Sequence, residues 1–90
     1  MKPGKTTVVV GGGTMGIDIA LTLARAGCRT HLVEPDAARR AALPALCAAG
    51  MAEFGCPGRL DLISLHATLE PIPWADVDAV IEAIPERLDI

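Results

Sequence analysis

Short β-branched runs and longer amphipathic stretches alternate along the chain. Residues 6–10 (TTVVV) are bounded by polar residues and glycines, a pattern that predicts a short buried strand. In residues 14–26 apolar side chains recur at helical spacing and polar side chains fall on the opposite face, which predicts an amphipathic helix. Gly27 stands where a left-handed residue would end this helix. The chain therefore opens with a strand that leads directly into a helix.

The next stretch repeats this alternation less regularly. Residues 29–34 (RTHLVE) predict a second strand, and Asp36 is placed to cap a helix that begins at Ala37. Pro44 lies inside this second helix, so we expect a kink or a restart near Leu43.

The last third of the chain predicts two further strands. Residues 55–58 (GCPG) give the strongest loop signal, and a third strand is expected around residues 62–66. Residues 78–84 (DAVIEAI) follow a turn-forming stretch and precede Pro85, so they predict a fourth, buried strand. Strands alternating with helices favour an α/β fold with a parallel sheet. We expect a truncated, Rossmann-type doubly wound sheet of strand order 3-2-1-4, which binds ligands at the switch point between strands 1 and 4.

The segment VVVGGGTMG (residues 8–16) carries the pattern G-x-G-x-x-G between the first strand and the first helix. Gly11 permits a tight turn, Gly13 leaves room for a pyrophosphate to approach the backbone, and Gly16 lets helix and strand pack closely. The helix N-terminus offers unpaired N–H groups and a partial positive charge to the phosphates. The position of the motif favours a dinucleotide-binding site over a tight turn without a ligand.

Glu34 lies 18 residues after Gly16, at the end of the second predicted strand. An acidic residue there is expected to accept hydrogen bonds from the adenosine ribose hydroxyls. A 2′-phosphate about 4 Å from this carboxylate would be repelled by roughly 4 kcal/mol at an effective dielectric near 20, which favours NAD over NADP. Arg39 and Arg40 could instead neutralise such a phosphate, although a solvated helix face is the simpler interpretation. FAD is the alternative cofactor, since flavoproteins use the same motif.

The composition is that of a folded protein, with 51% hydrophobic residues and a formal net charge of −3. We expect no nucleic-acid partner, because the basic residues are scattered and only Phe54 and Trp74 could stack on bases. No stretch approaches the roughly 20 apolar residues of a membrane span and no signal peptide is recognisable, so we expect a cytoplasmic protein. No metal site is expected, because Cys28, Cys47 and Cys56 lack C-x-x-C spacing and suitably spaced histidines.

Two stretches carry a more specific pattern than a dinucleotide fingerprint alone. They are VVVGGGTMGIDIALTLARAGCRTHLVEPD and ADVDAVIEAIPERLDI, which together cover about half of the chain. The first resembles the GxGTMGxxIA…AGxxVxLxD pattern, and the second the aDxViEavpE pattern, of the N-terminal NAD-binding domain of the 3-hydroxyacyl-CoA dehydrogenase family. The TMG in the glycine turn and the paired glutamates of IEAIPE are the most specific features of this resemblance.

The resemblance implies roles for residues at three points along the cofactor. The residues lining the pyrophosphate would be Gly11, Gly13, Thr14, Met15 and Gly16. Glu34 would bind the ribose, in place of the family's commoner Asp. The residues that follow the fourth strand into the nicotinamide crevice would be Ala83, Ile84 and Glu86.

The resemblance also implies an oxidoreductase of fatty acid metabolism, which exchanges hydride between NAD and a 3-hydroxyacyl-CoA thioester. In this family the catalytic His and Glu, and a helical domain that dimerises, lie beyond the equivalent of Ile90. We therefore expect residues 1–90 to be the NAD-binding half of a larger, homo-oligomeric enzyme, with no catalytic residue of their own and no activity alone. The family's longer charged hairpin is replaced here by the alanine-rich residues 36–60.

Two other functions fit the same motifs. The chain could be a stand-alone NAD-binding module without catalysis, or the nucleotide-binding half of another NAD-dependent hydroxyacid dehydrogenase. Whatever the function, a sheet that ends at the fourth strand would leave that edge and one face uncovered, with an apolar patch beside residues 78–84. We therefore expect the isolated chain to self-associate.

Overall fold

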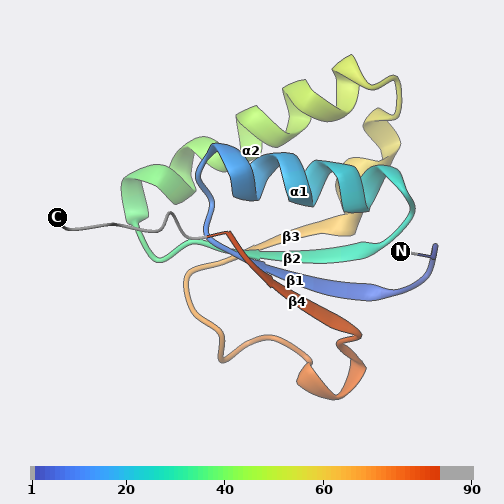
Figure 1. The fold of residues 1–90 in the computed structure, drawn as a ribbon. Helices are drawn as coiled ribbons and strands as arrows, with labels where there is room; N and C mark the ends of the chain where they lie inside the picture. Colours follow the sequence, from blue (N-terminus) through green and yellow to red (C-terminus); the bar gives the residue numbers. More distant parts are fainter. Residues whose placement is uncertain (1, 84–90) are drawn as a thin grey trace, which may run out of the picture.

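The computed structural model describes residues 2–83, which form a parallel sheet of four strands with two α-helices on one face (Figure 1). The regular elements are β1 (Thr6–Val10), α1 (Thr14–Arg25), β2 (Arg29–Val33), α2 (Ala37–Glu53), β3 (Ile63–His66) and β4 (Ala79–Glu82). Two 3₁₀ turns, η1 (Pro57–Leu62) and η2 (Trp74–Asp76), lie in the connections before β3 and β4. Neither α-helix in this part of the chain has the length and apolar character that crossing a bilayer requires.

The strands lie in the order β3-β2-β1-β4, and each neighbouring pair is parallel. Val9 of β1 pairs with Leu32 of β2 on one side and with Ile81 of β4 on the other. This topology confirms the truncated Rossmann-type α/β fold predicted from the sequence. Because the strands are parallel, the segments that follow β1, β2 and β4 meet at one edge of the sheet.

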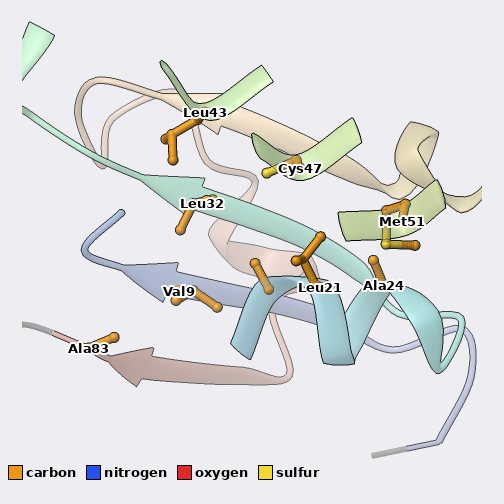
Figure 2. Packing of buried hydrophobic residues seen from close by; sticks show 9 residues of the cluster. Val9, Leu21, Ala24, Leu32, Leu43, Cys47, Met51 and Ala83 are labelled. Atoms are coloured by element: carbon orange, nitrogen blue, oxygen red, sulfur yellow. The ribbon is translucent and has the colours of Figure 1, made fainter. Parts of the chain in front are cut away.

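The main core fills the space between the sheet and its two helices (Figure 2). Val9 and Leu32 supply it from the central strands and are completely buried, as are Leu43 and Met51 of α2. Leu21 of α1 joins the same cluster. Burying a side chain of this size contributes about 1.5–3 kcal/mol, so these contacts fix how both helices sit on the sheet.

The opposite face of the sheet has a smaller apolar cluster. It consists of Val8 and Val33 from the sheet and Ile72 from the connection between β3 and β4. No α-helix of residues 2–83 covers this face (Figure 1). Val80 of β4 is 52% exposed, which places apolar surface on the strand where the sequence predicts it. Self-association of the isolated chain stays a prediction.

The helix α2 differs from its expected form. It runs from Ala37 to Glu53 with Pro44 inside it, so the helix does not restart near Leu43, while the kink named as the other outcome stays a prediction. Pro44 is exposed. Pro44 has no N–H, so the carbonyl of Arg40, four residues before it, loses its helical hydrogen bond. The buried contacts of α2 on either side of the proline hold the two parts in one helix.

The other boundaries differ from the expected ones by one or two residues. β3 begins at Ile63 because the preceding residues form the turn η1. β4 begins at Ala79, directly after Asp78, whose carboxylate accepts the N–H of Thr6 at 2.8 Å. Gly27 has a φ of +92°, in agreement with the predicted left-handed end of α1. The expected last strand residue, Ile84, lies outside the described residues.

A histidine pair lies on the sheet face away from the helices. His31 pairs in register with Val8, and its Nδ1 lies 2.9 Å from Nε2 of His66, so one ring donates to the other. The Nε2 of His31 is buried and has no hydrogen-bond partner within residues 2–83. Burial, together with the charges of His66 and Arg29, lowers the pKa of His31 from its ordinary value of 6.5.

From the lowered pKa of His31 we predict that the chain loses stability in mild acid. The unfolded chain takes up a proton at His31 as the pH falls through about 6.5, whereas the folded chain resists it until lower pH. The contribution of His31 to stability should therefore be fully present above this point and decline below it. Thermal unfolding from about pH 7 to about pH 5 should show a smaller decline for His31→Asn than for the natural sequence. Equal declines in the two proteins would contradict this assignment.

Candidate dinucleotide-binding site

The turn between β1 and α1 begins at Gly11. Its N–H still donates to the carbonyl of Val33 at 2.8 Å, so it continues the hydrogen bonding of the sheet. Its φ of +108° then turns the chain away from the strand, a conformation that residues with a Cβ rarely adopt. A glycine is therefore required at this position.

Gly16 lies in the first turn of α1, directly against Gly11. A Cβ on Gly16 would overlap the carbonyl oxygen of Gly11, and would lie 2.8 Å from its carbonyl carbon. The helix can approach the end of β1 this closely only because Gly16 has no side chain. This contact fixes the helix N-terminus above the edge of the sheet.

The N-terminus of α1 is open. Gly13 is the N-cap residue, no side chain of the described residues caps the helix, and its first turn has no acidic residue. A Cβ on Gly13 would meet no atom within 4 Å, so the space in front of it is free. Thr14 and Met15 follow and are exposed, Met15 by 65%. Free N–H groups, a helix dipole and open space together fit a phosphate group.

Glu34 follows β2 and lies beside this turn, with only 4% of its surface exposed. Its Oε1 accepts the N–H of Gly12 and its Oε2 accepts the N–H of Asp36, both at 2.9 Å. The backbone of Glu34 is also held: its N–H donates to the carbonyl of His66, and its carbonyl accepts from the Arg40 guanidinium. The carboxylate is therefore held by two backbone N–H groups, and the backbone of the same residue by two further hydrogen bonds.

Gly12 is a residue of this site that the sequence reasoning missed. A Cβ there would lie 3.0 Å from Cβ of Glu34 and 3.1 Å from Cδ1 of Leu43. The G-x-G-x-x-G pattern leaves this position open, and the signal that could have singled it out is the third consecutive glycine. Here the glycine lets the turn approach the Glu34 side chain and donate to it.

The turn and Glu34 border one pocket of about 200 Å³. Its lining residues are Val10, Gly11, Gly13, Glu34, Pro35, Arg39 and Ala83. Ala83 comes directly after β4 and is buried (Figure 2). The pocket therefore lies where the ends of β1, β2 and β4 meet, at the predicted switch point of the sheet.

The pocket brings together Gly11, Gly13, Glu34 and Ala83 from among the residues predicted for the site. Thr14, Met15 and Gly16 lie in the adjoining first turn of α1 but do not line it. Ile84 and Glu86 lie outside the described residues. Val10 and Pro35 were missed, because nothing in their residue types distinguishes them from ordinary strand and turn positions. In the described part of the chain, no three His, Cys, Asp or Glu side chains are grouped to hold a metal ion.

Comparison with known proteins agrees with this geometry. A family model, the NAD-binding domain of 3-hydroxyacyl-CoA dehydrogenase, matches residues 6–90. A search of curated proteins found no match. The family match spans the glycine turn, Glu34 and the end of β4, which are the three parts of the pocket. The chain therefore belongs to the family of NAD-binding domains of the 3-hydroxyacyl-CoA dehydrogenases, and its cofactor is NAD.

Proposed function

We propose that this chain holds NAD in the pocket between the glycine turn and Glu34, as the cofactor-binding half of a 3-hydroxyacyl-CoA dehydrogenase. NAD would supply the hydride acceptor for oxidation of a 3-hydroxyacyl thioester, and as NADH the hydride donor for the reverse reaction. The observation that carries the proposal is the hydrogen bond from Gly12 to Glu34. This bond supports the proposal because it joins the glycine turn, which would bind the pyrophosphate, to Glu34, which would bind the ribose, beside one pocket.

The N-terminus of α1 would bind the pyrophosphate. The backbone N–H groups of Thr14, Met15 and Gly16 belong to the first turn, where a helix leaves its donors without partners. The helix dipole adds a partial positive charge at the same point. It stabilises an exposed anion by about 0.3–1 kcal/mol, and a partly buried one by up to about 2 kcal/mol. Gly11 and Gly13 let the phosphates come close to the backbone.

Glu34 would bind the adenosine ribose. A carboxylate has about four acceptor positions, of which Gly12 and Asp36 occupy two. The remaining positions can accept the 2′- and 3′-hydroxyls of the ribose. Because backbone donors already fix the carboxylate, it does not have to be ordered when the cofactor binds.

The end of β4 would border the nicotinamide. Ala83 lines the pocket and donates its N–H to the carbonyl of Val10 at 2.8 Å, so the chain leaves the sheet directly beside the glycine turn. We propose that Ile84 and Glu86 continue this border, on the basis of the family resemblance.

The general base of the reaction would come from outside this chain. Glu34 and Arg39 are the titratable residues among the pocket's lining residues, and Glu34 is committed to the backbone and the ribose. His31 and His66 bond to each other on the other side of the sheet. We therefore propose that this half acts with a catalytic, dimerising domain in a cytoplasmic enzyme of fatty acid metabolism, whose substrate is an acyl-CoA.

Substitution at Gly13 tests the binding role of the turn. In Gly13→Val the new side chain enters the open space in front of the helix, and the residue's φ of −75° and ψ of −172° suit a β-branched residue. We expect NADH affinity to fall at least about tenfold by calorimetric titration, and stability to fall by only about 1 kcal/mol, because valine is a poorer N-cap than glycine.

Gly58→Val is the matched control, because Gly58 also faces open space and lies in η1, outside the pocket. It should bind NADH like the natural sequence. The proposed position of the pyrophosphate would be wrong if Gly13→Val bound NADH normally, or if both variants weakened binding equally.

The substrate class predicts a difference between thioester and free acid. The natural protein that carries this sequence should oxidise NADH with acetoacetyl-CoA and be at least about a hundredfold slower with acetoacetate, because the carrier contributes binding energy that the free acid lacks. NADH consumption measures both rates. Faster turnover of the free acid would instead identify another hydroxyacid dehydrogenase. Residues 1–90 alone should turn over neither substrate.

A further inference from the structure

Arg39 is the cation on the rim of the cofactor pocket. It lines the pocket together with Glu34, and its Nη1 lies 3.7 Å from Oε1 of that residue. The Arg39 side chain is 56% exposed, whereas that of Glu34 is 5% exposed. A ligand group that approaches the adenosine end from solvent therefore meets the guanidinium before it meets the carboxylate.

The Arg39 guanidinium forms an ion pair with Glu34, but its N–H groups remain available to a ligand. It makes no hydrogen bond within residues 2–83, and the distance to Glu34 is too long for one. Its backbone, in contrast, is fixed, because its N–H donates to the N-capping carboxylate of Asp36 at 2.8 Å.

The neighbouring Arg40 binds the backbone instead of the pocket. Its Nη1 donates to the carbonyls of Glu34 and Pro35, at 2.9 and 3.2 Å, so it holds the turn after β2. Arg40 is not among the residues that line the pocket. Of the two arginines that the sequence places after Glu34, the structure puts only Arg39 on the pocket.

The arrangement weakens the argument that Glu34 alone excludes a 2′-phosphate. Two backbone N–H groups and the Arg39 guanidinium face the carboxylate. Charges of opposite sign at similar distances from a phosphate contribute Coulomb terms that oppose each other. A guanidinium also donates paired hydrogen bonds to a phosphate, with a geometry that an ammonium cannot offer.

We propose that Arg39 determines cofactor specificity by binding the 2′-phosphate of NADP(H), so that this chain binds NADPH within about tenfold of NADH. The inference rests on the proposed function of the pocket and adds a second cofactor to it. NADH needs only the ribose contacts to Glu34 and is bound more tightly, while NADPH exchanges part of them for the guanidinium.

The test compares NADH and NADPH by calorimetric titration of three proteins: the natural sequence, Arg39→Gln and Arg25→Gln. Arg25→Gln is the charge-matched control, since Arg25 is exposed at the far end of α1 over the ring of Phe54. We expect Arg39→Gln to lose about tenfold in NADPH affinity and less than about threefold in NADH affinity. Arg25→Gln should leave both affinities unchanged.

Other results would overturn the proposal in distinguishable ways. If the ratio of the two affinities is the same in Arg39→Gln as in the natural sequence, whether both affinities fall or neither does, the role of Arg39 is refuted and the NAD site is left intact. Failure of the folded natural chain to bind either nucleotide would refute the proposed function, and this inference with it.

A fragment probe isolates the same contact. Adenosine 2′-monophosphate should displace NADH from the natural chain and should lose about tenfold in potency with Arg39→Gln. Adenosine 5′-monophosphate, which lacks the 2′ group, should keep its potency. Equal behaviour of the two fragments would also refute the assignment.

Discussion

The buried carboxylate of Glu34 is the constraint on which the site depends. A charged group with 4% exposure must be paired or hydrogen-bonded. Each hydrogen bond that such a buried group fails to make costs about 1–3 kcal/mol or more. Here the partners are backbone N–H groups of Gly12 and Asp36, which belong to the glycine turn and to the start of α2. One side chain therefore joins the turn, β2 and α2 at the edge of the sheet.

This constraint links the fold to the chemistry of the pocket. Gly12 can donate to Glu34 only because the turn leaves β1 at Gly11, and the turn can close only because Gly16 lets α1 rest against it. The groups that stabilise the turn are the groups that would contact the cofactor. A site built in this way is ordered before the ligand arrives, so less conformational entropy is lost on binding.

Much of the fold follows from local signals. The β-branched run before the glycines, the cap at Asp36 and the glycine at the end of α1 are short-range features, and the structure confirms each of them. The uninterrupted course of α2 through Pro44 was not predictable in this way, because it depends on which face of the helix meets the sheet. The sequence could not show that Arg39 lines the pocket while Arg40 binds the backbone carbonyl of Glu34. The two residues are adjacent and of the same type, so only the tertiary structure distinguishes them.

The most direct test of the account follows the backbone amides of the isotope-labelled chain by NMR while NADH is added. The account predicts that the largest shifts fall on residues 11–16, Glu34 and Ala83, which belong to the glycine turn, the start of α1 and the ends of β2 and β4. Amides on the sheet face that carries Val8 and Ile72 should change little. Shifts concentrated away from the glycine turn, or no shifts in a folded chain, would contradict it.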